Sequence, residues 1–274
     1  MNGGTAGGAR AVCAGMQIMI DSKARFSSRV DNYIRYRPGY PRGLVGLLAR
    51  ECGLTPDSIV ADIGSGTGLL SLPFLKNGNL VHGVEPNREM RLAGEALLRD
   101  HARFHSVAGS AEQTGLPAAS VDLLVAGQAF HWFDHARCRE EFARILRPGG
   151  WVVLVWNYRR HEASAFLQAY EHLLLRFCPE YPKILDRDAQ QRDVGAFFGR
   201  RPHRLECLAN RQDFDFQGLE GRHLSQSYVE QSGEYFEPMM RELRVLFDAH
   251  NTKGKVAFEY ETRVYFGRLT DLRN

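Results

Sequence analysis

The chain has 274 residues, of which 44% are apolar and 24% are charged, a balance typical of a folded domain with a buried core. The formal net charge is only +3, and Lys and Arg do not occur in runs longer than two, which argues against a generic nucleic-acid binder. Five widely spaced cysteines without a C-x-x-C pair argue against a disulfide scaffold or a metal site and favour a reducing cytoplasm. No stretch approaches the ~20 apolar residues that cross a bilayer.

The chain divides by composition into a short tail and one domain. Residues 1–22, rich in Gly and Ala, are predicted to be a disordered tail. Residues 23–274 are predicted to form a single domain, with a core over 42–157 and a helical cap and C-terminal hairpin over 158–274.

Short apolar runs alternate with helical patterns from Ser58 to Asn157. Asn87 and Asp134 are expected to cap two of the helices between them. This alternation predicts a parallel, doubly wound sheet. The expected strands are Ile59–Ile63, Leu80–Val84, Phe104–Val107, Val121–Ala126 and Trp151–Trp156.

The pattern changes after Asn157. Residues 163–200 are expected to be mainly helical, followed by a strand over 205–216 and a helix over 235–250. Residues 257–267 alternate with period two, which is typical of an antiparallel strand with one buried face. The predicted fold class is therefore α/β: a doubly wound, mostly parallel seven-strand sheet with an antiparallel C-terminal edge strand and helical additions.

The strongest motif is the loop VADIGSGTG at the end of the first expected strand, where open α/β sheets bind ligands. Glycines at this turn permit positive φ and close approach of a ligand. Dinucleotide enzymes also use G-x-G, but the spacing here is G-x-G-x-G and not G-x-G-x-x-G. Asp62 precedes the first glycine, where a carboxylate would repel a pyrophosphate and suit a sulfonium-bearing amino acid.

Two further polar segments follow the next two strands. Glu85 can accept hydrogen bonds from both hydroxyls of a ribose, or it can be a solvated acid or a helix cap. Gly109–Glu112 can line an adenine slot, or it can be a simple loop. With Asp62 and the glycines in register, a nucleoside ligand is the favoured interpretation.

Taken together, the motifs VADIGSGTG, VHGVEP, GSAEQTGLP, VDLLVAGQAFHWFD and ILRPGGWVVLVWN resemble those of class I S-adenosylmethionine-dependent methyltransferases, in order and spacing. The resemblance covers about residues 30–160. YIRYRPGYP, AFHWFD, SQSY and YETRVYFG resemble, more narrowly, the trans-aconitate-methyltransferase-like branch.

The family resemblance implies S-adenosyl-L-methionine as the methyl donor. It places Asp62 near the methionine end, Glu85 at the ribose, Ala111 and Glu112 beside adenine, and Gln128 beside the methionine portion. The full set of expected donor-binding residues is Asp62, Gly64, Ser65, Gly66, Thr67, Gly68, Glu85, Pro86, Met90, Ser110, Ala111, Glu112, Gly127 and Gln128.

Candidate acceptor residues follow the fourth strand in Phe130–Asp134. His131 is a candidate base or orienting group, and Trp132 and Phe130 are candidate pocket walls. The alternative is that these aromatic residues pack a helix against the sheet and that His131 is a satisfied hydrogen-bond donor beside them.

A second group of candidates precedes the core. Tyr33, Arg35, Tyr36 and Arg37 are placed to fold over the donor as a lid, with an arginine holding a carboxylate of the donor or of the acceptor. Solvated arginines on a turn are the alternative. Tyr158, Arg159 and Arg160, after the fifth strand, are weaker candidates of the same kind.

The sequence leaves the methyl acceptor open. The leading hypothesis is an anionic small molecule, with a carboxylate as one candidate acceptor. RNA or protein methylation and a non-catalytic donor-binding protein are the alternatives. Gly127-Gln128-Ala129-Phe130 stands where an N-P-P-Y-type tetrapeptide would indicate methylation of nucleic-acid bases. The sequence indicates neither a membrane partner nor an oligomeric state.

Overall fold

The computed structural model describes residues 35–182 and 187–269, with side chains omitted over 187–192. The predicted tail (1–22) and the candidate Tyr33 lie outside the described residues. Among the helices that are described, none is long and apolar enough to cross a membrane.

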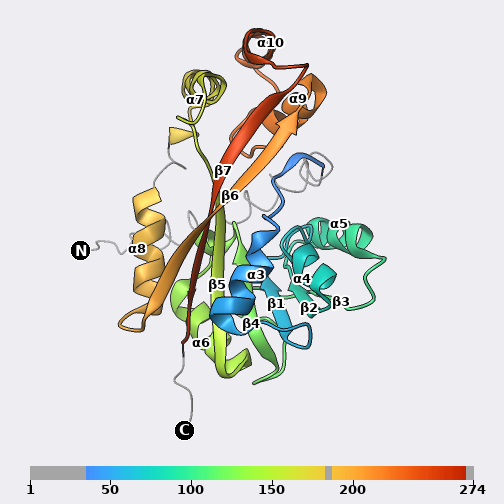
Figure 1. Ribbon diagram of the computed structural model, residues 1–274, viewed down its shortest axis with the longest axis vertical. Coiled ribbons are helices and arrows are strands. Elements are labelled where there is room, and N and C mark those ends of the chain that lie inside the picture. The colour runs from blue at the N-terminus through green and yellow to red at the C-terminus, as the bar shows by residue number, and fades with distance from the viewer. Residues whose placement is uncertain (1–34, 183–186, 270–274) are drawn as a thin grey trace, which may run out of the picture.

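A seven-stranded sheet forms the centre of the molecule, in the order β3-β2-β1-β4-β5-β7-β6 (Figure 1). The first five strands are parallel, and β7 is antiparallel to both β5 and β6. The predicted fold class is therefore confirmed, with the C-terminal hairpin at one edge and β6 as its outermost strand. The strands are β1 Ile59–Ile63, β2 Leu80–Val84, β3 Phe104–Val107, β4 Val121–Gly127, β5 Leu146–Arg159, β6 His203–Phe214 and β7 Val256–Gly267.

The helices follow the predicted alternation, with differences at their ends. Asn87 and Asp134 cap α5 and α6 as expected, each accepting two backbone N–H groups. The helix after the glycine loop begins only at Ser71, because Gly68 at φ 81° still belongs to the turn. The helices are α3 Gly43–Cys52, α4 Ser71–Asn77, α5 Arg88–Leu98, η1 Phe130–Trp132 (3-10), α6 His135–Ile145, α7 Ala165–Phe177, α8 Arg187–Phe198, α9 Phe216–Leu224 and α10 Phe236–His250.

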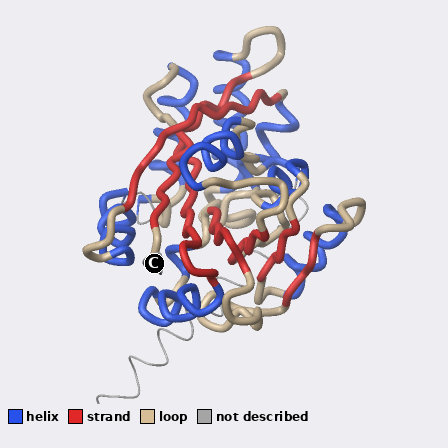
Figure 2. Tube along the Cα trace, turned by 60° about the horizontal axis from the view of Figure 1, so that its bottom comes forward, coloured by secondary structure: helices blue, strands red, loops and turns tan. Residues whose placement is uncertain are grey.

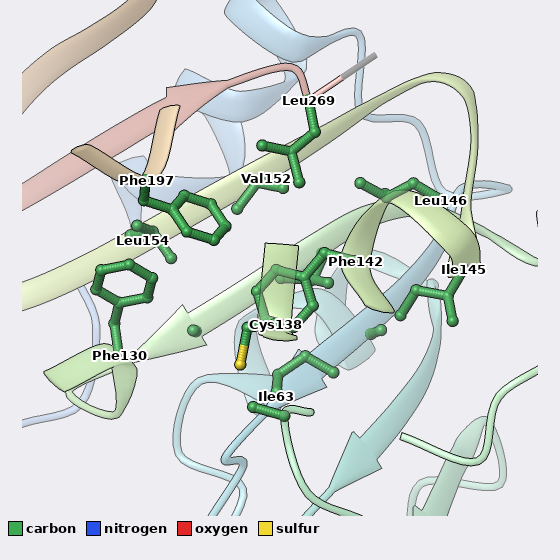
Figure 3. Close-up of a cluster of buried hydrophobic side chains, with 14 of the residues drawn as sticks. Ile63, Phe130, Cys138, Phe142, Ile145, Leu146, Val152, Leu154, Phe197 and Leu269 are labelled. Atoms are coloured by element: carbon green, nitrogen blue, oxygen red, sulfur yellow. The ribbon is translucent and has the colours of Figure 1, made fainter. Parts of the chain in front are cut away.

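Helices cover both faces of the sheet, so its parallel strands are buried on two sides (Figure 2). On one face, α6 and α8 pack Phe142 and Phe197 against β4 and β5 (Figure 3). On the other, α3 and α4 contribute Leu48 and Phe74 to a second apolar cluster. This packing on both sides fixes the carboxyl ends of β1, β2 and β4 as one rigid edge.

Beyond that edge lies the cap. Strands β5, β6 and β7 have 14, 12 and 12 residues, and they continue past the sheet centre to α7, α9 and α10 (Figure 1). A third apolar cluster joins these helices to the far part of β7 through Tyr170, Leu219, Leu243 and Phe258. Because β5 runs parallel to β4 and leads into α7, the cap stands at the carboxyl ends of the parallel strands.

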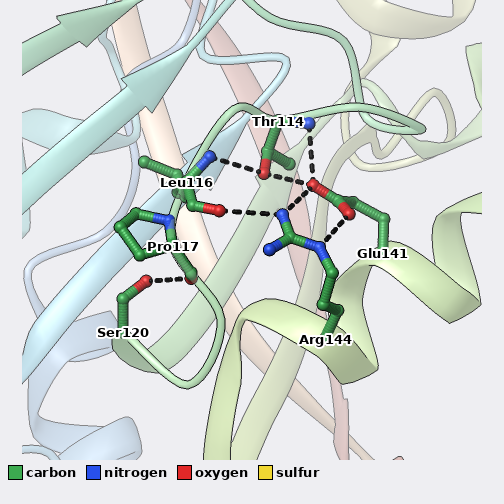
Figure 4. A network of polar contacts seen from close by, with 6 residues as sticks. All are labelled: Thr114, Leu116, Pro117, Ser120, Glu141 and Arg144. Carbon is green, nitrogen blue, oxygen red and sulfur yellow. Dashed lines mark hydrogen bonds and ion pairs between the residues drawn. The ribbon is translucent and has the colours of Figure 1, made fainter.

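A partly buried polar network holds the loop after β3 against α6 (Figure 4). Glu141 accepts hydrogen bonds from the backbone N–H of Thr114 at 2.9 Å and from Arg144 at 2.7 Å. Arg144 also donates to the carbonyl of Leu116 at 2.8 Å. The loop that carries the expected adenine-binding residues is thus anchored at its far end.

Candidate functional site

The glycine loop leaves β1 in a conformation that favours glycine. Gly64, Gly66 and Gly68 have φ values of 67°, 56° and 81°. The amides of Gly64 and Ser65 donate to the carbonyl of Val84 at 2.9 and 3.1 Å, which ties the loop to β2. A Cβ on Gly64 would stand 2.7 Å from the Ala129 side chain, so the loop also packs closely on the segment after β4.

Asp62 lies beneath this loop and is 1% exposed. Its Oδ2 accepts a hydrogen bond from the Ser71 hydroxyl at 2.7 Å, whereas its Oδ1 is buried with no hydrogen-bond partner in the described part of the chain. The buried hydroxyl of Thr67 likewise has none. Burial, with Glu85 nearby, raises the pKa of Asp62 to about 7. A cationic group of a bound donor would satisfy this carboxylate.

Glu85 follows β2 and is buried next to the glycine loop. Its Oε2 accepts from the amide of Gly66 at 3.0 Å and its Oε1 from the amide of Asn87 at 2.8 Å. A carboxylate has acceptor sites for more than two hydrogen bonds, so ribose hydroxyls can still bind there. The observed contacts also give Glu85 a structural task, because it joins the loop to the start of α5.

The remaining expected donor residues lie around the loop in different settings. Met90 is buried, with its Cε 3.3 Å from where a Cβ on Gly66 would stand, and Pro86 is exposed. Glu112 accepts from the amide of Asp134 at 3.0 Å. Burial acts to raise the pKa of Glu112, but this amide and the hydroxyl of Ser110 outweigh it and lower that pKa. Glu112 is therefore ionised and is already bonded to the start of α6.

A pocket lies between the glycine loop and the segment before the core. Arg37, Tyr40, Asp62, Gly127 and Gln128 are among the residues that line it. Gln128 adopts a positive φ of 57°, a strained conformation that tends to occur at functional sites. A Cβ on Gly127 would collide with the hydroxyl of Tyr40, so this glycine permits the close approach.

The aromatic segment after β4 divides into buried and exposed parts. Phe130 is buried against Trp156 and Phe197. This position favours a packing role for Phe130 over a place in the pocket wall. Trp132 is 46% exposed and its ring lies 4.8 Å from that of His131. His131 is exposed as well, and no hydrogen bond or ion pair joins its imidazole to a carboxylate within the described residues.

The segment before the core packs between the pocket and the cap. Arg37 lines the pocket and donates to the carbonyl of Ser225 at 3.0 Å. Tyr36 lies against Gly221 of α9, where a Cβ would overlap its ring, and the exposed Arg35 stacks over Tyr36 at 5.4 Å.

Of the three candidates after β5, one points into the cap. Arg159 has a side chain that is only 10% exposed, and it donates to Glu171 and, at 2.6 Å, to the hydroxyl of Tyr181. Arg160 lies 3.7 Å from Glu259 on the hairpin, and Arg263 of β7 stacks over the Tyr158 ring at 4.9 Å.

Sequence reasoning missed one residue that connects these parts. Asn157, at the carboxyl end of β5, accepts at its carbonyl from Gln128 at 3.2 Å and donates to the carbonyl of Gly39 at 3.2 Å. Its side-chain oxygen accepts from Thr262 and Asn210 of the hairpin. A polar residue at the end of a strand of this sheet is the signal that could have identified it.

Comparison with known proteins agrees with this geometry. Residues 61–154 match the family described as "Methyltransferase domain". An uncharacterized methyltransferase of Mycobacterium bovis is 38% identical over 139 residues, which are 51% of this chain and 54% of that protein. A Saccharomyces cerevisiae protein named as an S-adenosylmethionine-dependent methyltransferase is 30% identical over 50% of this chain and 48% of its own length. The chain therefore spans about half the length of these relatives.

A solved structure described as a type II methyltransferase from Anaeromyxobacter dehalogenans covers 86% of this chain and 99% of its own, with 26% identity and a TM-score of 0.63. Residues 61–154 therefore match a methyltransferase domain, and the sheet order and the glycine loop have the arrangement expected of an S-adenosylmethionine-dependent methyltransferase. The buried carboxylate of Asp62, with one oxygen unpartnered among the described residues, fits the cationic donor of that class.

Proposed function

We propose that the whole chain transfers the methyl group of S-adenosylmethionine to a small-molecule acceptor and that the accepting atom is a carboxylate oxygen. The donor supplies an electrophilic methyl group on a sulfonium. The carboxylate oxygen forms the new C–O bond as the C–S bond breaks, and the thioether leaves as a neutral group that needs no proton. The protein's task is to align the two reactants and exclude water.

The state of His131 is the observation that carries the choice of acceptor. Its imidazole is exposed, and in the described part of the chain no carboxylate orients it or raises its basicity, so it is poorly set up to deprotonate an alcohol or an amine. A carboxylate is already ionised at neutral pH and needs no base. His131 is then a group that orients the acceptor, with the Trp132 ring 4.8 Å from its own.

The small size of the acceptor follows from the cap. Tyr36 and Arg37 contact α9 and the turn after it, so the segment that lines the pocket is packed against the cap, an arrangement that favours a small acceptor over a polymer. The motif YIRYRPGYP, of which the structure describes residues 35–41, also supports membership of the trans-aconitate-methyltransferase-like branch. The free thiols of Cys52, Cys138, Cys178 and Cys207 support a cytoplasmic location.

The test is transfer of a labelled methyl group from S-adenosylmethionine into a metabolite extract and, in parallel, into RNA and protein. We expect label in a small product that is released as methanol by mild alkali, because methyl esters hydrolyse whereas N-methyl and ether groups do not. Asp62→Ala is the donor-deficient control. Alkali-stable label, or label in RNA or protein, would contradict the proposed acceptor, and no transfer at all would leave a donor-binding protein.

A further inference from the structure

The cap contains a group of basic and phenolic side chains that the donor site does not use. We call it the cap cluster: the buried Tyr170, Arg222 and His223 and the half-buried Arg159 and Tyr228. The residues come from β5, α7, α9 and the turn that follows α9. Burial raises the pKa of the Tyr228 phenol, while Arg159, Arg222 and Arg37 act to lower it. Guanidinium groups from three separate segments thus lie near one hydroxyl.

Arg222 is the most unusual member of the cap cluster. It is 4% exposed, and within the described residues it has no carboxylate at ion-pair distance. Its hydrogen bonds are long, 3.3 Å to the Tyr260 hydroxyl and 3.4 Å to the Ser225 hydroxyl. Removing a charge from water without a counter-charge is costly, so structural arginines at such positions are normally paired.

His223, the next residue on α9, has an unused nitrogen. Its side chain is 0% exposed, and its Nδ1 lies 2.9 Å from the Tyr170 hydroxyl. Its Nε2 is buried without a hydrogen-bond partner among the residues that the structure describes. Burial, followed by Arg222 and Arg159, lowers the pKa of His223 to about 3, so the ring is neutral. If Nδ1 accepts from Tyr170, Nε2 carries a hydrogen that it can donate.

The charge of the cap cluster is also unbalanced. The cluster holds two guanidinium charges, on Arg159 and Arg222. Glu171 accepts hydrogen bonds from Arg159 and from the hydroxyl of Tyr181, and it neutralises the charge of Arg159. Arg222 keeps its charge, and beside it His223 has a free donor atom. A group that satisfies both is an oxyanion, because it brings negative charge and acceptor oxygens together.

The cap cluster adjoins the donor pocket through Arg37. This residue lines the pocket, and its guanidinium donates to the carbonyl of Ser225. The hydroxyl of the same Ser225 is the partner of Arg222. A molecule bound at the cap cluster would therefore lie on the cap side of the donor, where an acceptor must be.

We propose that the cap cluster is an oxyanion-binding subsite for the acceptor, in which Arg222 and His223 hold a carboxylate or phosphate group of that molecule. The inference rests on the proposed function for the identity of the ligand as acceptor. A guanidinium-bound oxygen is a weaker nucleophile, so the group held here is a handle and not the accepting atom.

The test is binding of simple oxyanions to the full chain saturated with S-adenosylhomocysteine. Acetate, malonate and inorganic phosphate are titrated by calorimetry into the wild type, Arg222→Met and Arg176→Met. Arg176 is an exposed cap arginine paired with Glu242, so its variant makes the same charge change outside the cluster. We expect Arg222→Met to weaken binding about 10- to 100-fold, the loss of a hydrogen bond to a charged group, and Arg176→Met to bind like the wild type.

Two further readouts separate a binding role from a structural one. Arg222→Met should keep its affinity for S-adenosylhomocysteine and should melt no lower than the wild type, because it removes a buried charge that lacks a counter-ion. Equal probe binding by Arg222→Met and the wild type would overturn the proposal, as would no probe binding by the wild type or an equal loss of donor affinity. Intact probe binding without methyl transfer would contradict the proposed function alone. Preference for carboxylates or for phosphate identifies the group on the acceptor.

Discussion

Donor affinity should depend on pH through Asp62. The carboxyl is 1% exposed, and burial, with Glu85 nearby, raises its pKa to about 7 against an ordinary value of 3.8. The free protein therefore holds a proton on Asp62 below neutrality. A donor with a sulfonium and an ammonium group binds the ionised carboxylate, so binding must displace that proton when the pH is low.

The pKa sets the size of the effect. At pH 6 about one molecule in ten carries ionised Asp62, and at pH 8 about nine in ten do. The affinity for S-adenosylmethionine should thus rise about tenfold between pH 6 and pH 8, or about 1.4 kcal/mol, and then level off. The contribution of Asp62 to the free energy of unfolding of the free protein changes with pH in the opposite direction. Because the folded state keeps the proton that the unfolded chain loses above pH 3.8, this contribution falls as pH rises towards 7.

Calorimetry in buffers of different ionisation heat measures both the affinity and the number of protons released. Asp62→Asn is the matched control, since it is nearly isosteric and cannot titrate. We expect weak binding by Asp62→Asn that does not change between pH 6 and pH 8, and release of close to one proton by the wild type at pH 6. Wild-type affinity that stays constant over this range, with no proton released, would refute the raised pKa as the controlling factor.

Three substitutions test other parts of the site. Glu85→Ala should weaken donor binding by about 1–3 kcal/mol in calorimetry. The substitution also removes the carboxylate that accepts from the amides of Gly66 and Asn87. Unchanged donor affinity would limit Glu85 to that structural role. Gly127→Ala should lower the unfolding free energy by about 1–3 kcal/mol because its Cβ meets Tyr40, and adding Tyr40→Ala should recover part of the loss in melting temperature. Glu141→Gln should cost about 1–3 kcal/mol at neutral pH. Arg144 lowers the pKa of Glu141 to about 2, so the difference from wild type should disappear as pH falls from 4.5 towards 2, and a constant difference would contradict that origin.

The core could be predicted because its signals are local. Each strand from β1 to β5 is a short apolar run, and Asn87 and Asp134 cap the helices that their sequence positions indicate. Helix α9 was not predicted, because Gly218 and Gly221 lower its helix propensity. The structure explains Gly221: the ring of Tyr36 occupies the place of a Cβ, a contact across the chain that no local pattern reveals.

For the site, the sequence indicates the donor side but not the buried side chains of the cap. The glycine loop and the two acids after β1 and β2 occupy fixed positions in a doubly wound sheet, so their approach follows from topology alone. Arg222 and His223 carry no local signal, since their surroundings come from Arg159, Tyr170 and Tyr260 on three other elements. These residues come together only because β5, β6 and β7 extend past the carboxyl ends of the other strands.

Three features that cost stability lie at the donor pocket and in the adjoining cap. Asp62 has a buried carboxylate oxygen without a partner among the described residues, Gln128 has a strained backbone, and Arg222 has a buried charge without a counter-ion there. A fold selected for stability alone would remove such features, because replacing each is expected to be neutral or favourable. Their position between the glycine loop and the cap indicates what does satisfy them. Under the proposed function, a cationic donor would neutralise Asp62 and an anionic acceptor would neutralise Arg222. The two reactants would then balance opposite charges on the two sides of the transferred methyl group.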